Sequence, residues 1–189
     1  MSGGTPGRRR LLPAACLLAL AGLLAGTPAH AQNQAPADGG AAANDQLDEK
    51  IRELIPEALA REALQQALRT IRPELCQGDD MCRLASAEEF ANPPLTPDDA
   101  RAAIYFAMRS AATQWCGLDY KRSYLPMLVY GKHRRKMTDR ELFLLSLIHG
   151  EFMGEQVSKY VESGQDCPPE LRERIDSTFP RLPESGVVE

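Results

Sequence analysis

The sequence lacks the short motifs that mark the common catalytic, metal and cofactor sites. It has no CxxC, HExxH or CxxCH spacing, no glycine-rich phosphate loop and no serine in a nucleophile-elbow pattern. Its three histidines are too few and too scattered to suggest a zinc site. We therefore expect no metal and no cofactor, and a non-enzymatic role is favoured over catalysis.

The sequence also lacks an excess of positive charge. It holds 22 Lys and Arg residues against 26 Asp and Glu residues, which gives a net charge of −4. Proteins that bind nucleic acid or anionic lipid need a basic surface, so this balance disfavours both kinds of partner.

The first 31 residues have the order of a secretory signal peptide. Three arginines precede an apolar run from Leu11 to Gly26, and the small triplet Ala29–Ala31 follows it. The run reaches about 24 Å as a helix, short of the roughly 30 Å hydrocarbon core of a membrane. Cys16 lies inside the run rather than at its end, so we expect it to leave with the signal instead of carrying a lipid.

Cleavage after Ala31 predicts a periplasmic or secreted protein with no transmembrane anchor. The removed segment holds three arginines and no acid, so the net charge falls from −4 to −7. After the signal we expect a flexible linker at 32–44, a helical domain at 45–180 and a flexible C-terminal tail at 181–189, because the two flanking segments are rich in small residues or proline.

The domain shows helical periodicity and no strand-like alternation. Its apolar residues recur at three- and four-residue steps. Thr96 and Thr138 are typical N-caps, the first followed by proline and acids and the second by a glutamate that completes a capping box. Gly117 and Gly164 are typical helix ends.

Two prolines affect where helices begin. Pro56 either kinks one helix over residues 49–72 or lies in the first turn of a second helix. Pro126 is compatible with a helix if Ser123 is the N-cap. The N–H groups of the first turn have no acceptor within the helix, so the N–H that proline lacks is not needed there. Together the pattern predicts an all-α fold, a single disulfide-stabilised helical bundle of about five or six helices.

Four cysteines remain after the signal, an even number in a compartment where disulfides persist. Three pairings are open from sequence alone. If successive helices run up, down and up, Cys116 and Cys167 lie at the same end of the domain. We therefore expect Cys116–Cys167, and a second bridge, Cys76–Cys82, around a small polar loop.

His149 lies in an unusual stretch, His-Gly-Glu-Phe-Met-Gly-Glu, in the middle of the most apolar helix. One interpretation is close helix packing at Gly150 and Gly154, which are four residues apart. The other makes His149, with Glu151 or Glu155, a candidate ligand-binding or pH-sensing group in a cavity left by the glycines. His149 and Glu151 do not share a helix face, so an acid–base pair between them is poorly supported.

A single basic run interrupts the acidic mature chain. At the end of a helix it complements the negative end of the helix dipole, and solvation alone would explain it. The alternative is a docking patch for an acidic partner or a lipid headgroup. The run comprises Lys132, His133, Arg134, Arg135 and Lys136.

These features favour a periplasmic, non-enzymatic binding or accessory protein that acts through contacts with another periplasmic or envelope protein. The layout from Cys116 to Pro168 is similar to small periplasmic helical proteins such as acid-stress chaperones and immunity proteins of secreted toxins. This resemblance rests on two cysteines and the helix count, so it implies a chaperone-like or inhibitor-like role and assigns no residue roles. Oligomers are compatible with it. The alternative is a small-ligand binder or enzyme with a pocket around His149.

Peptide mapping of the exported protein without reduction tests the processing and pairing predictions together. We expect an N-terminal Gln32 and two linked peptide pairs, Cys116 with Cys167 and Cys76 with Cys82. A peptide linking Cys76 to Cys116 would contradict the predicted topology.

Overall fold

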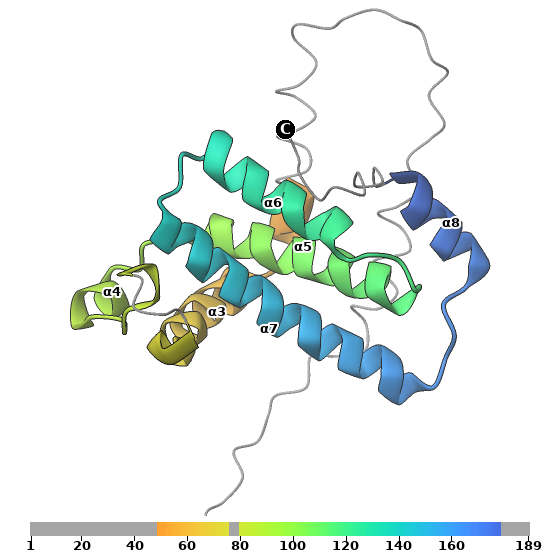
Figure 1. The fold of residues 1–189 in the computed structure, drawn as a ribbon, viewed down its shortest axis with the longest axis horizontal. Helices are drawn as coiled ribbons and strands as arrows, with labels where there is room; N and C mark the ends of the chain where they lie inside the picture. Colours follow the sequence, from red (N-terminus) through yellow and green to blue (C-terminus); the bar gives the residue numbers. More distant parts are fainter. Residues whose placement is uncertain (1–48, 76–79, 179–189) are drawn as a thin grey trace, which may run out of the picture. The chain divides into compact units, whose positions relative to one another are not determined.

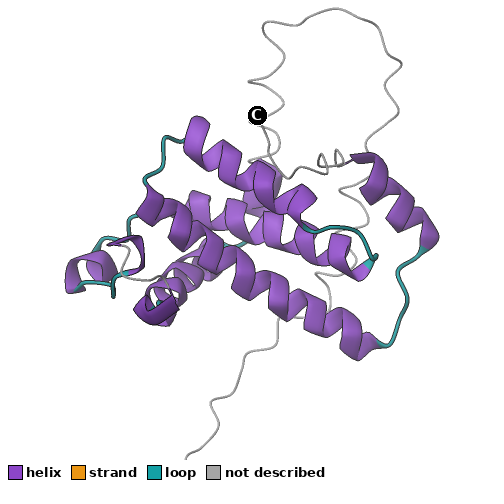
Figure 2. Cartoon of the chain, viewed as in Figure 1, coloured by secondary structure: helices purple, strands orange, loops and turns teal. Residues whose placement is uncertain are grey.

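The computed structural model describes residues 49–75 and 80–178, and every regular element in them is helical (Figure 2). This confirms the all-α expectation. The predicted signal peptide at 1–31, the linker at 32–44 and the tail at 181–189 lie outside the described residues. Within the described part, no helix is both long and apolar enough to cross a membrane.

Seven α-helical stretches and two short 3₁₀ turns make up the described part, against the five or six helices expected. The additional helix is α4, whose five residues are too short to show a period. In chain order the elements are a helix at 49–54, α3 (Glu57–Thr70), η1 (Pro73–Leu75), η2 (Asp80–Cys82), α4 (Ala87–Ala91), α5 (Pro97–Trp115), α6 (Lys121–His133), α7 (Asp139–Ser163) and α8 (Pro169–Thr178).

Helix α5 is the element on which the others pack. It contacts α3, α6 and α7, whereas α6 has few contacts with α7 (Figure 1). The residues on one of its faces are alanines, and they have no exposed surface. Because alanine adds only a methyl group to the backbone, this stripe lets the neighbouring helices approach α5 closely. The stripe consists of Ala100, Ala103, Ala107 and Ala111.

The predicted helix caps are present. The Thr96 and Thr138 hydroxyls each accept a hydrogen bond from the backbone three residues on, and the acids at those positions complete capping boxes. Gly117 and Gly164 have φ angles of +70° and +63°, the left-handed conformation that glycine adopts without steric cost. The bounds of α5 and α7 therefore follow from local sequence.

The predicted start of α6 at Ser123 is wrong. The helix begins at Lys121, because the Asp119 side chain accepts the Lys121 N–H at 3.0 Å and Tyr120 serves as the N-cap residue. Ser123 is therefore inside the helix and fully buried, and Pro126 lies beyond the first turn. The proline is tolerated there because it is exposed and removes a single backbone hydrogen bond.

Pro56 separates two helices rather than kinking one. The first helix ends at Leu54, and Pro56 is the N-cap residue of α3, one position before the first turn where it was expected. Its φ of −57° and ψ of 146° turn the chain between the two helices.

The disulfide Cys116–Cys167 is present, as predicted, with an S–S distance of 1.98 Å. It joins the end of α5 to the segment before α8, where Ala112, Cys116 and Ile175 form a small buried cluster. Cys82 is buried and disulfide-bonded. Its predicted partner, Cys76, lies outside the described residues, so the Cys76–Cys82 pairing stays a prediction.

A buried ion-pair network holds α4 against α7. Arg140 at the start of α7 donates to Glu89 at 3.1 Å and to the Met81 and Arg83 carbonyls at 2.7 and 2.9 Å. Burial alone would raise the pKa of Glu89, but hydrogen bonds from Arg83, the Ser86 amide and Arg140 outweigh it and hold that pKa at about 2. Glu89 is therefore ionised at neutral pH.

Replacing Arg140 with leucine should lower the free energy of unfolding by about 3 kcal/mol, because it leaves the Glu89 carboxylate poorly compensated in a buried position. Urea denaturation measures the change. The matched control is Arg61→Met, which removes an exposed i,i+4 pair with Glu57 and should cost less than about 1 kcal/mol. Equal losses in the two variants would contradict the structural role given to Arg140.

Candidate functional site

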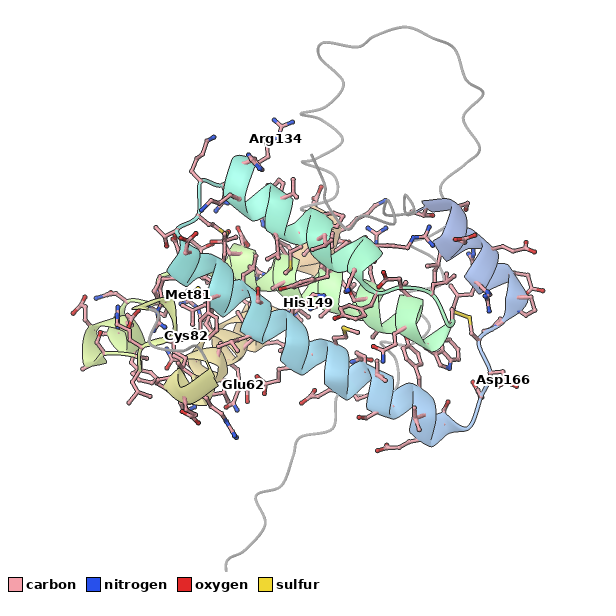
Figure 3. The ribbon with its side chains drawn as sticks, viewed as in Figure 1. Glu62, Met81, Cys82, Arg134, His149 and Asp166 are labelled. Atoms are coloured by element: carbon pink, nitrogen blue, oxygen red, sulfur yellow. A yellow bond between two sulfur atoms is a disulfide. The ribbon has the colours of Figure 1, made fainter. Side chains whose placement is uncertain are left out.

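His149 lies midway along α7 and is 2% exposed (Figure 3). Its Nε2 lies 2.9 Å from the Ser110 hydroxyl of α5, which is itself fully buried. The Tyr124 ring of α6 packs against the imidazole, with 4.9 Å between ring centroids. Three helices therefore position this side chain, and both contacting groups are uncharged.

Burial lowers the pKa of His149 to about 4, and a hydrogen bond to the Phe106 backbone opposes the shift without cancelling it. The imidazole is therefore neutral at pH 7. A neutral imidazole has one nitrogen that donates and one that accepts a hydrogen bond.

Neither acid predicted to work with His149 is a partner of it. Burial and then the charge of Glu155 raise the pKa of Glu151, while Gln66 and Arg69 of α3 lower it. Glu151 therefore faces α3, and Glu155 is exposed. The structure therefore does not bring Glu151 or Glu155 next to His149, because residues two and six positions away point to other sides of a helix. A ligand-binding or pH-sensing role of the three residues stays a prediction.

Close helix packing at Gly150 and Gly154 is also wrong. Both glycines are exposed, and a β-carbon built on either one meets nothing within 4 Å. The closely packed glycine is instead Gly131, where a β-carbon would lie 2.8 Å from Leu142 Cδ2. Gly150 and Gly154 cost the helix about 1 kcal/mol each relative to alanine, and no contact among the described residues requires them.

The two glycines line an open hollow beside His149, with a volume of about 450 Å³. The lining comes from α6 and α7 and from the C-terminal end of α5, and none of it carries a charge at pH 7. We call this feature the His149 hollow. It is lined by Gln114, Tyr120, Tyr124, Ser146, His149, Gly150, Met153, Gly154 and Val157.

The predicted docking patch lies at the other end of α6, and all five of its side chains are exposed (Figure 3). Lys132 pairs with Asp139 at 2.7 Å, and Arg135 pairs with Asp99 at 2.9 Å. Arg134 and Lys136 have no ion-pair partner in the described part of the chain. Two side chains of the basic run are therefore held by ion pairs within the chain.

The exposure of two apolar side chains beside the patch was not predicted from the sequence. Val129 and Tyr130 of α6 are 43% and 46% exposed. One feature of the sequence indicates a distinct surface here: residues 120–138 contain six Lys and Arg residues and no Asp or Glu, although the chain as a whole is acidic. We call Val129, Tyr130 and the basic run at 132–136 the α6 surface.

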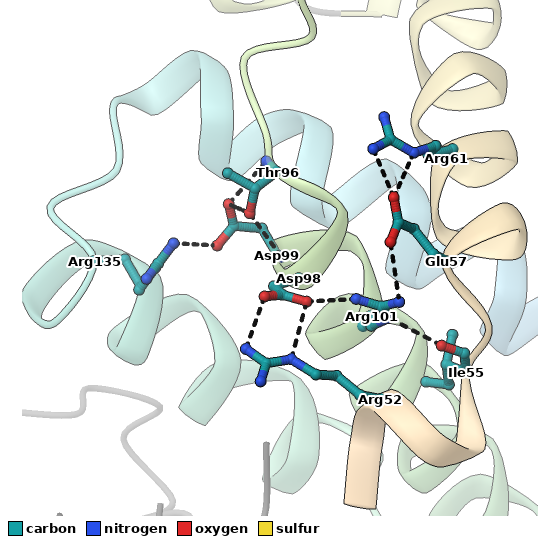
Figure 4. Close-up of polar contacts among 9 residues, drawn as sticks. All are labelled: Arg52, Ile55, Glu57, Arg61, Thr96, Asp98, Asp99, Arg101 and Arg135. Carbon is teal, nitrogen blue, oxygen red and sulfur yellow. Dashed lines mark hydrogen bonds and ion pairs between the residues drawn. The ribbon is translucent and has the colours of Figure 1, made fainter. Parts of the chain in front are cut away.

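A second hollow, of about 410 Å³, adjoins the α6 surface where Tyr130 and Arg135 meet the start of α5. Its charged rim is already paired, as Figure 4 shows: Arg52 and Arg101 both donate to Asp98, and Arg135 reaches Asp99. Hydrogen bonds from Arg52, the largest influence, lower the pKa of Asp98. This network fixes Arg135 relative to α5.

Lys136 has a φ of +55°, in the left-handed region that a lysine seldom occupies. The Met137 amide donates to the Gly131 carbonyl at 3.1 Å and closes the loop around it. The loop thereby presents Arg134 and Lys136 in a defined conformation.

No group of three or more His, Cys, Asp or Glu side chains in residues 49–75 and 80–178 is placed to hold a metal ion.

The depressed pKa of His149 predicts a stability loss in weak acid. The unfolded chain takes up a proton near pH 6.5 and the native imidazole only near pH 4, so stability falls as the pH drops through this window. The contribution is about 3 kcal/mol. Urea denaturation from pH 7 to pH 4 should show a smaller loss for His149→Gln than for the wild type. Parallel curves would contradict the assignment.

Comparison of the chain with models of protein families, with curated proteins and with solved structures finds no match.

Proposed function

We propose that this is an exported, non-enzymatic binding protein whose α6 surface docks an acidic segment of a partner protein. The observation that carries the proposal is the combination of exposed Val129 and Tyr130 with two cations, Arg134 and Lys136, that have no ion-pair partner among the described residues. Apolar side chains beside unpaired charges are the composition of a protein interface, in which aromatic residues and arginine contribute most.

Charge complementarity indicates the chemistry of the partner. The segment from 120 to 138 carries six cations and no carboxylate of its own. Acids of other segments pair with Arg122, Lys132 and Arg135, so Arg134 and Lys136 are the cations of the α6 surface that attract an acidic chain and speed the encounter. A nucleic acid or an anionic lipid surface would be repelled by the acidic remainder of the mature protein. A protein partner can instead place a few acids on Arg134 and Lys136 and an apolar side chain against Tyr130.

Export is supported by the order of residues 1–31, a basic start, an apolar run and a small-residue cleavage site. The bridge between Cys116 and Cys167 is consistent with it, because disulfides persist in oxidising compartments.

A defined partner is favoured over a chaperone that holds many unfolded chains. The large exposed apolar side chains in the described part are few, and only Val129 and Tyr130 are sequence neighbours. A holdase needs a broad apolar surface to cover unfolded chains. The five side chains are Leu84, Tyr120, Val129, Tyr130 and Val161.

The test begins with a photo-crosslinking amino acid in place of Val129, in the full chain produced with its own leader in cells of its source. The crosslinked protein is then purified and titrated against the wild type. Tyr130→Ser and the double variant Arg134→Glu, Lys136→Glu should each bind at least about tenfold more weakly.

The matched controls remove equivalent groups elsewhere. Leu84→Ser takes away a side chain that is 67% exposed, and Arg72→Glu reverses an exposed charge on the segment after α3. Both should bind like the wild type. If the purified partner binds all four variants equally, or if its crosslinked segment carries no acids, the α6 surface is not the docking site.

A further inference from the structure

We propose that residues 179–189, which follow α8, run back along α6 and cover the α6 surface, so that the partner's acidic segment must displace them. The inference deepens the proposed function and rests on it for the identity of the competing partner. The coverage itself involves this chain alone and is measured without a partner. We call these residues the 179–189 segment.

The starting point of the segment is fixed beside the first turn of α6. Arg122 in that turn is buried, and it donates to the Asp176 carboxylate of α8 at 2.6 Å and to the Asp176 carbonyl at 2.9 Å. Ile175, the preceding residue, is buried in the cluster next to the disulfide. The last turn of α8 is therefore anchored at α6, and the chain leaves it at Thr178.

One face of α6 leads from this anchor to the α6 surface. Helix residues that follow one another at steps of four, three and four lie on the same side of the helix. Arg122, Pro126, Val129 and His133 have this spacing, and the last three are exposed. A chain that leaves α8 at Arg122 can therefore follow an exposed face of α6 to the basic run.

The segment is long enough to reach the basic run. Arg122 and His133 are separated by about 17 Å along the axis of α6, at 1.5 Å per residue. An extended chain advances roughly 3.3 Å per residue, so the stretch from Thr178 to Val187 spans up to about 30 Å. This length leaves room for a curved path between the two ends.

The composition of the segment matches the surface it would cover. Two valines and a glutamate follow one another at 187–189, and Glu184 is a second acid. The α6 surface has the same order, an exposed apolar pair, Val129 and Tyr130, and then cations that have no ion-pair partner among the described residues. Arg181, the cation of the segment, is three residues from α8 and thus far from the basic run.

The cover is weak enough for a partner to displace it. A contact of two small apolar side chains and one or two exposed ion pairs has a Kd on the order of 1 mM. A segment tethered close to its target has an effective concentration of about the same size. The covered and open forms therefore have similar populations, and the cover lowers the partner's apparent affinity about two- to threefold.

The experiment that tests coverage places a photo-crosslinking amino acid at Val188 in the full chain, expressed with its own leader and purified without reduction. Peptide mass spectrometry then locates the crosslink. We expect it to join Val188 to residues 126–136 of the same molecule. Crosslinks between two molecules are separated as dimers by size.

Charge reversal tests the pairing between the segment and the basic run. The double variant Arg134→Glu, Lys136→Glu should lower the yield of the Val188 crosslink at least about threefold, because its acids then face like charges. Adding Glu184→Lys and Glu189→Lys to that variant should restore the yield. A restored yield also excludes a general loss of folding as the cause.

A second measurement follows displacement by the partner that Val129 crosslinking identifies. The variant Glu184→Lys, Glu189→Lys should bind this partner about two- to threefold more tightly than the wild type, because the segment no longer competes. The matched control is Glu170→Lys, Glu173→Lys, which changes the net charge equally at exposed positions of α8 and should bind like the wild type.

A Val188 crosslink outside residues 126–136, or one mainly between two molecules, would overturn the coverage. A yield that charge reversal leaves unchanged would do the same. Coverage without any gain in partner affinity over the matched control would overturn the competition. A partner that binds elsewhere on the protein would contradict the proposed function and the competition together, while the Val188 crosslink would still show whether the segment covers α6.

Discussion

The alanine stripe of α5 is the constraint on which the rest of the described structure depends. Side chains reduced to a methyl group at four positions, spaced three or four residues apart, let α3 and α7 come close to the α5 backbone. That approach brings His149 of α7 within 2.9 Å of Ser110. It also leaves α6 packed mainly on α5, so that the outer side of α6 stays uncovered. Both candidate sites thus follow from the spacing of helices around one small-residue face.

Local chemistry made part of this fold predictable. A hydroxyl followed by an acid three residues later marks the starts of α5 and α7, and a glycine marks each end, because these signals act within a single turn. The bridge between Cys116 and Cys167 was predictable from topology, since successive helices that alternate in direction bring the ends of α5 and α7 to the same side.

The remaining features depend on contacts between distant parts of the chain. Arg140 and Glu89 are 51 residues apart, and nothing near either residue in sequence indicates their pairing. The glycines show the same limit: Gly150 and Gly131 both interrupt apolar helices, but only the position of the neighbouring helix decides that Gly131 is packed and Gly150 is open. Sequence reasoning placed His149 beside a cavity but misassigned its partners, because the hydroxyl of Ser110 comes from another helix.

The central claim is that the α6 surface is where this protein meets its partner, and amide hydrogen exchange of the purified complex tests it most directly. The account predicts added protection in α6 and the loop through Lys136, with α3 and α8 unchanged on binding. Protection confined to α3 or α8, with the amides from Val129 to Lys136 exchanging as in the free protein, would contradict it.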